Sequence, residues 1–177
     1  MSNIFFKILH DIARVVDNIN ESLGRLTAWL VVAMVGLTLY DVAMRYMFNN
    51  GSIAVQELEW HLFGIVILFG ASHTLKYDDH VRVDLVYSSA KLSDRHRAII
   101  DVVGTFAFSL PFSVLIIWTS IPFAYDAYSH AEISPDPGGL SYRWLLKAAI
   151  PLGFALLALQ ALANAFRALV SLSSGDR

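Results

Sequence analysis

Four long apolar runs, separated by short polar segments, set the pattern of this sequence. The runs cover residues 26–46, 57–76, 101–125 and 146–168, and most of their charged residues stand near the ends. An α-helix needs about 20 predominantly apolar residues to cross the hydrocarbon core of a bilayer. Each run therefore predicts one transmembrane helix, and together they predict an all-α membrane protein with a single membrane domain over residues 1–177.

Two further segments have the pattern of surface helices. Residues 3–24 repeat apolar side chains at helical spacing, opposite a face that includes Lys7, Asp11 and Arg14. This pattern predicts an amphipathic helix that lies on a membrane or against a partner. A secretory signal is the weaker interpretation, because these charges interrupt the apolar stretch and no small-residue cleavage site follows. Residues 83–92 are half apolar and predict a short surface helix between the second and third spans.

Charged residues at the facing ends of the first two spans form a candidate anchoring cluster. The uncharged part of the second span, residues 62–75, is only about 21 Å long as a helix, so the span draws Glu59 towards the hydrocarbon edge. A buried carboxylate there needs a partner. Asp41 and Arg45 are one turn apart in the order that favours a local ion pair; the alternative is that Arg45 reaches Glu57, Glu59 or an acid on another subunit. The predicted cluster comprises Asp41, Arg45, Tyr46, Glu57, Glu59 and Trp60.

Proline marks the third span and the loop that follows it. Pro111 and Pro122 stand inside the span and predict that it kinks or ends early. Residues 134–139 contain two prolines and two glycines and cannot be helical. The aromatic residues on either side of this loop are typical of a membrane interface: Tyr125, Tyr128, Tyr142 and Trp144.

The fourth span contains two amide side chains one helical turn apart, Gln160 and Asn164. Amides at this depth can hydrogen-bond to a neighbouring membrane helix. We expect an interhelical packing role for both, in preference to a role in transport chemistry.

Composition excludes several classes of function. The chain is 56% hydrophobic and 16% charged, whereas soluble domains are about a quarter charged. A net charge of −2 without a run of Lys and Arg argues against nucleic acid. The absence of cysteine removes thiol catalysis, disulfides and thiolate metal sites. The spans carry no nucleophile or acid-base constellation at depth, so we expect no enzyme and no catalytic residue.

Cofactor sites are also poorly supported. A four-helix haem anchor needs axial histidines on facing helices, but His61 and His73 are both on the second span. The polar residues after that span have the chemistry of metal ligands, yet nothing fixes a coordination geometry, and solvated loop side chains are the simpler interpretation: Asp78, Asp79, His80 and Asp84. We therefore expect no cofactor, no metal and no substrate-binding residue in this chain.

The distribution of basic residues predicts the orientation. Ten of the thirteen Lys and Arg residues lie in the N-terminal arm, the loop between the second and third spans, and the tail. The other face has only Arg45, Arg143 and Lys147. The positive-inside rule then places both termini in the cytoplasm and the loops around Asn49 and Pro135 outside.

These observations indicate a membrane scaffold that meets other proteins. An independent transporter is disfavoured, because the sequence has no inverted repeat and no pair of interrupted spans at matching positions. A stand-alone small channel and a haem-binding anchor remain as alternatives.

Five short motifs follow one another along the four spans: Asp41-x-x-x-Arg45-Tyr46-x-Phe48, Glu57-x-Glu59, Gly70-Ala71, His80-Val81-Arg82-Val83-Asp84, and Pro151-Leu152-Gly153-Phe154 with Gln160. In this order and spacing they resemble the small membrane subunit of tripartite ATP-independent periplasmic (TRAP) transporters, the DctQ-like family. Each motif is weak alone, and the resemblance covers nearly the whole chain.

The resemblance implies a bacterial inner-membrane complex for uptake of an organic acid, driven by a sodium or proton gradient. The partners would be a large multi-span subunit, a periplasmic substrate-binding protein and membrane lipids, with substrate and ions bound in the large subunit. The small subunit would extend the scaffold, and its outward loops would help dock the binding protein. The candidate docking residues on this chain are Glu132, Ser134, Asp136, Tyr142 and Arg143.

Overall fold

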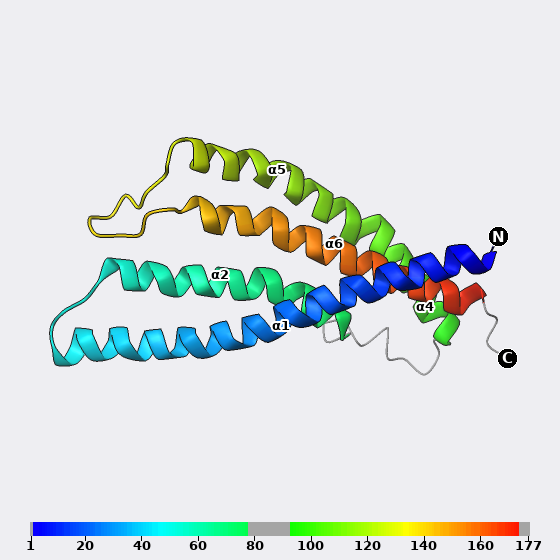
Figure 1. Ribbon diagram of the computed structural model, residues 1–177, viewed down its shortest axis with the longest axis horizontal. Coiled ribbons are helices and arrows are strands. Elements are labelled where there is room, and N and C mark those ends of the chain that lie inside the picture. Colours follow the sequence, from blue (N-terminus) through cyan, green and yellow to red (C-terminus); the bar gives the residue numbers. More distant parts are fainter. Residues whose placement is uncertain (1, 78–92, 174–177) are drawn as a thin grey trace.

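The computed structural model describes residues 2–77 and 93–173. All regular structure in these two ranges is helical (Figure 1). The elements are α1 Ser2–Met47, α2 Ile53–Lys76, α4 Asp94–Gly104, the π-helix η1 Thr105–Ser109, α5 Leu110–Ser129 and α6 Trp144–Ser173. The described helices form four rods, in which α4, η1 and α5 follow one another without a break. All four are long and apolar enough to cross a membrane, so the predicted all-α membrane fold with four spans is confirmed. The surface helix predicted at 83–92 lies outside the described residues.

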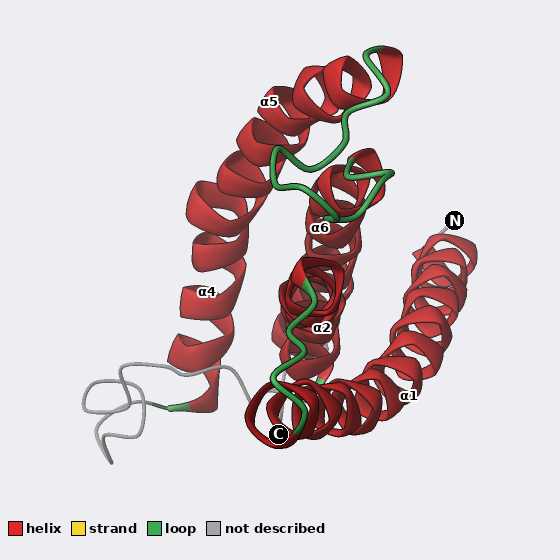
Figure 2. Ribbon diagram, turned by 90° about the vertical axis from the view of Figure 1, so that its left-hand side faces the viewer, coloured by secondary structure: helices red, strands yellow, loops and turns green. Residues whose placement is uncertain are grey.

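The rods form two antiparallel hairpins that lie side by side. The α1–α2 hairpin turns at residues 48–52, and α5 is joined to α6 by residues 130–143. Both connections lie at one end of the molecule, here called the loop end, while the start of α1 and the end of α6 lie at the other, the terminal end (Figure 1). Figure 2 shows α2 and α6 in the middle, with α1 on one side and the α4–α5 rod on the other.

The predicted surface helix 3–24 and the first span are one continuous helix, α1, of 46 residues. Its N-terminal part runs past the end of α2 and crosses α6 (Figure 1). Ala13 and Val16 pack against Ala163 of α6 at this crossing. Ile12 and Val15 remain exposed on α1, so an apolar stripe of the arm is free to meet lipid or another protein.

The third span continues through both of its prolines. The π-helical turn η1 stands immediately before α5, and Pro111 occupies the first turn of α5. Pro122 lies inside α5, which runs on to Ser129. Of the two predicted alternatives, an early end does not occur; the rod instead curves along its length (Figure 2), and a π-helical turn and proline are both recognised causes of bending.

Small residues allow the helices to approach closely, both within a hairpin and between the two hairpins. A Cβ atom on Gly24 of α1 would lie 2.2 Å from Nδ1 of His73 on α2, and one on Gly153 of α6 would lie 2.9 Å from the carbonyl oxygen of Leu68 on α2. The core is also made largely of small side chains, including Ala149, which is buried in α6. Close backbone approach at small residues is the usual basis of helix packing in membranes.

Candidate functional site

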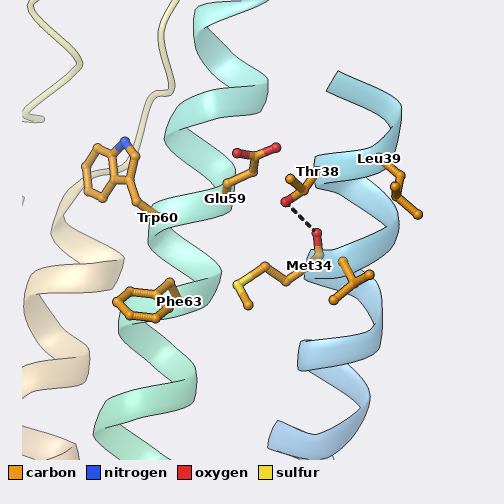
Figure 3. A pocket seen from close by; sticks show the side chains of 7 residues that line it. Met34, Thr38, Leu39, Glu59, Trp60 and Phe63 are labelled. Atoms are coloured by element: carbon orange, nitrogen blue, oxygen red, sulfur yellow. Dashed lines mark hydrogen bonds between the residues drawn. The ribbon is translucent and has the colours of Figure 1, made fainter. Parts of the chain in front are cut away.

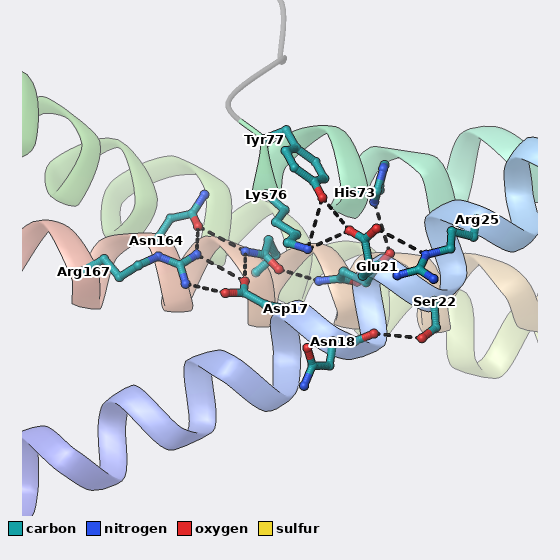
Figure 4. A network of polar contacts seen from close by, with 12 residues as sticks. Asp17, Asn18, Glu21, Ser22, Arg25, His73, Lys76, Tyr77, Asn164 and Arg167 are labelled. Atoms are coloured by element: carbon teal, nitrogen blue, oxygen red, sulfur yellow. Dashed lines mark hydrogen bonds and ion pairs between the residues drawn. The ribbon is translucent and has the colours of Figure 1, made fainter.

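Polar side chains concentrate at the two ends of the helical hairpins, and each end has its own network. At the terminal end the network joins three helices (Figure 4). Its members come from α1, α2 and α6: Asp17, Asn20, Glu21, His73, Lys76, Tyr77, Gln160, Asn164 and Arg167.

Gln160 is the centre of the terminal network and is completely buried. The Nδ2 atom of Asn20 donates to Oε1 of Gln160 at 2.6 Å. Gln160 Nε2 in turn donates to Asp17 at 3.0 Å and to Asn164 at 3.1 Å. Asn164 donates to the carbonyl oxygen of Leu75 at 2.9 Å. The two amides of the fourth span thus connect α6 to both α1 and α2.

Two ion pairs surround these amides. Lys76 Nζ of α2 donates to Glu21 of α1 at 2.8 Å, and the Tyr77 hydroxyl donates to the same oxygen at 2.6 Å. On the other side, Arg167 of α6 donates to both oxygens of Asp17, at 2.7 and 3.3 Å. Sequence reasoning missed this set of contacts. The signal in the sequence was the pair of acidic residues Asp17 and Glu21, which stand one helical turn apart on one face of the N-terminal arm.

At the loop end, Glu57 holds the connection between α5 and α6. Its side chain is buried in the first turns of α2. The Ser134 hydroxyl donates to Oε1 at 2.5 Å, and the Leu140 backbone N–H donates to Oε2 at 2.6 Å. Glu57 of the first hairpin therefore holds the loop of the second hairpin, although the residues in contact are about 80 positions apart in the sequence.

The loop closes tightly around this carboxylate. Ser134 N–H donates to the carbonyl oxygen of Leu140 at 3.0 Å, and Ser134 Oγ accepts from the Asp136 N–H at 3.1 Å. Gly138 has φ +82°, a conformation that favours glycine. A Cβ on Gly139 would lie 2.4 Å from Ser134 Oγ and 2.8 Å from Glu57 Oε2. We name residues 132–142 the platform loop, because these contacts give it one defined shape.

The five predicted docking residues do not share one environment. Ser134 is buried, and its hydroxyl group donates a hydrogen bond to Glu57. Glu132 is half-buried, and it forms an ion pair with Lys147 and a longer contact with Arg143, 3.8 Å between the nearest atoms. The Arg143 guanidinium also lies 5.5 Å from the ring centre of Trp60.

Only Asp136 and Tyr142 of that set are exposed. Tyr142 is held in the left-handed region, with φ +65°. Ile133, which the sequence did not single out, is exposed beside them. Together with other exposed residues of the platform loop, these three side chains are free to contact another protein.

The predicted anchoring cluster is split into separate sites. Arg45 forms its ion pair with Asp41, the local alternative, and among the described residues it pairs with neither Glu57 nor Glu59. Tyr46 projects from the end of α1 and is 79% exposed. Glu59 stands apart from all of these, and its Oε1 atom is buried without a hydrogen-bond partner in the part of the chain that the structure describes.

The described residues contain no group of three or more His, Asp or Glu side chains that could hold a metal ion. The two histidines considered for haem are both engaged with backbone oxygens, His61 with Glu57 at 2.6 Å and His73 with Asn20 at 3.2 Å. The terminal network thus holds α1, α2 and α6 together, and the Glu57 contacts hold the platform loop.

Comparison with known proteins agrees with this architecture. Residues 34–171 match the family model for the DctQ component of tripartite ATP-independent periplasmic transporters. The C4-dicarboxylate TRAP transporter small permease protein DctQ of Vibrio cholerae is 30% identical over 161 residues, which cover 80% of this chain and 67% of that protein. A Haemophilus influenzae protein, provisionally named a TRAP transporter small permease protein, is 27% identical over 124 residues, 70% of this chain and 76% of the relative. With four membrane-spanning rods and a match over most of its length, the chain belongs to the DctQ family of TRAP transporter small membrane subunits.

Proposed function

We propose that this subunit is an immobile scaffold that packs against the large membrane subunit of its transporter and presents the platform loop to a periplasmic binding protein. The transporter would take up an organic acid by using a sodium or proton gradient, and both the acid and the ion would bind in the large subunit. The observation that carries the proposal is the Glu57 contact, which joins the two hairpins and fixes the platform loop. A rigid loop loses little conformational entropy when it docks a partner.

The orientation belongs to the same proposal. The loop end would face the periplasm and the terminal end the cytoplasm, as the excess of Lys and Arg in the arm, the loop between α2 and α4, and the tail predicts. The chain has no cysteine, so single cysteines are clean reporters. A cysteine at Gly51 should react with a membrane-impermeant maleimide in intact spheroplasts, whereas one at Ser171 should react only after the membrane is opened. The reverse pattern would overturn the orientation.

Assembly can be tested by co-purification. A tagged copy of this chain should retain the large subunit through detergent extraction and gel filtration, in a fixed ratio. A large subunit that separates completely from this chain under conditions that keep both folded would contradict the scaffold role.

Docking can be tested by crosslinking from the platform loop. Cysteines at Asp136 and Tyr142, both exposed, should crosslink to the binding protein through a short bifunctional reagent. A cysteine at Ser171, at the opposite end of the molecule, is the matched control and should not. Failure at both loop positions, with the complex intact, would refute docking at this loop.

A further inference from the structure

A groove runs between α1 and α2 near the loop end, with an open volume of about 410 Å³. Its walls are mostly apolar and come from both helices, as Figure 3 shows. The lining residues are Met34, Val35, Thr38, Leu39, Glu59, Trp60 and Phe63. Val35, Leu39 and Phe63 are each more than half exposed, so a helix laid in this groove would cover substantial apolar surface.

Glu59 is the one charged residue in the lining. It points from α2 into the space between the two helices (Figure 3). Its Oε1 atom is buried, and no described residue forms a hydrogen bond or an ion pair with the carboxylate. The one hydroxyl group in the lining, that of Thr38, donates to the carbonyl oxygen of Met34 at 3.0 Å.

The Lys and Arg side chains at the loop end already have acidic partners. Arg45 pairs with Asp41, while Lys147 and Arg143 contact Glu132. An unpaired carboxylate in an apolar, partly water-excluded place is costly, and in membrane proteins such a group normally meets a donor on another element. The groove therefore has an apolar wall and a carboxylate, that of Glu59, which has no cationic partner among the described residues.

We propose that this groove receives one helix of the large subunit, and that Glu59 pairs with a Lys or Arg side chain on that helix. The inference rests on the proposed function and adds the contact face and its chemistry. An acyl chain could cover the apolar wall but offers nothing to the carboxylate. A lipid headgroup approaches from the bilayer surface, whereas Glu59 lies in the second turn of α2 with one oxygen shielded from solvent. A basic side chain on a helix that lies along the groove meets both requirements.

The contact face can be tested with a photo-crosslinking amino acid in the assembled complex. p-Benzoylphenylalanine at Leu39 or Phe63 should crosslink to the large subunit, and the crosslinked peptide should come from a membrane helix that carries Lys or Arg. Crosslinks only to lipid, or to a second copy of this chain, would overturn the inference. Since the complex itself is recovered in that case, the scaffold role would survive; loss of co-purification in the unmodified chain would instead refute the proposed function.

The charge can be tested separately. Glu59→Lys should lower recovery of the large subunit by about tenfold or more, because a buried charge pair becomes a repulsion. Glu59→Leu in the purified single chain should melt no lower than the unmodified chain, because the unpaired carboxylate contributes nothing to this fold by itself. Asp126→Asn is the matched control, since Asp126 is an exposed acid at the loop end, and it should leave recovery unchanged. Replacing the Lys or Arg of the crosslinked helix with Glu should restore assembly with Glu59→Lys; normal recovery of the Glu59→Lys variant alone would contradict the pairing.

Discussion

The crossing of α1 and α2 at Gly24 allows a sharp test of the packing. A Cβ at this position would lie 2.2 Å from Nδ1 and 2.4 Å from Cγ of His73. The imidazole cannot easily swing away, because Nδ1 is 3.2 Å from the Asn20 carbonyl oxygen and the ring packs edge-on against Tyr77 at 5.0 Å. Gly24→Ala must therefore separate the helices or displace the ring. On the same helix, a Cβ on Gly36 would meet no other described side chain or helix within 4 Å, so Gly36→Ala is the matched control.

The expected magnitude follows from three contributions. Overpacking a close contact costs about 1 to 3 kcal/mol, and the lost interhelical hydrogen bond of His73 adds about 0.6 kcal/mol. The higher helix propensity of alanine returns about 1 kcal/mol. The net destabilisation of Gly24→Ala is then about 0.6 to 2.6 kcal/mol, whereas Gly36→Ala should be neutral or stabilising by up to about 1 kcal/mol.

Thermal unfolding of the detergent-purified chain, followed by circular dichroism, measures the difference. For a chain of this length each kcal/mol corresponds to about 2 to 4 °C, so Gly24→Ala should melt at least about 1 °C below the unmodified chain. His73→Ala should remove much of the penalty in the double variant, because it empties the space that the new methyl group needs. Equal melting temperatures for Gly24→Ala and Gly36→Ala would refute the close crossing.

Two further changes probe the networks at the two ends. Gln160→Leu should lower the melting temperature, because it removes three hydrogen bonds of α6 that are worth about 2 kcal/mol together. It also leaves the Asn20 side chain without its partner. An unchanged melting temperature would mean that the network contributes nothing to stability. Glu57→Leu should release the platform loop without unfolding the helices, because an apolar side chain cannot accept from either the Ser134 hydroxyl or the Leu140 N–H. Faster hydrogen exchange at Leu140 is the measurement, Asp126→Asn is the control, and unchanged exchange would contradict the anchoring of the loop by Glu57.

The four spans could be predicted because a membrane helix needs only length and the absence of charge, and both are local properties. The continuity of α1 was harder to see. Its arm changes from amphipathic to uniformly apolar near Arg25, and such a change in composition does not break a helix. The course of the third span was left open between a kink and an early end, because a π-helical turn beside Pro111 has no distinct sequence signal.

The partners of polar side chains could not be predicted from sequence, because they depend on which helices lie together. Glu57 and Glu59 stand two positions apart and looked alike, yet one holds a loop on the other hairpin and the other faces a groove without a partner among the described residues. The same limit applied to the platform loop. Glu132 and Arg143 had the chemistry of a docking surface, but in the fold both are only part-exposed and contact each other.

The central claim is that this chain is a scaffold that needs a partner to support transport. The most direct measurement is uptake of radiolabelled organic acid into proteoliposomes, under an imposed sodium or proton gradient, with this chain, the large subunit and the binding protein supplied together or singly omitted. The account predicts uptake with all three components, a strong loss when this chain is omitted, and no flux through this chain alone. Solute flux through the purified chain, or full uptake in its absence, would contradict it.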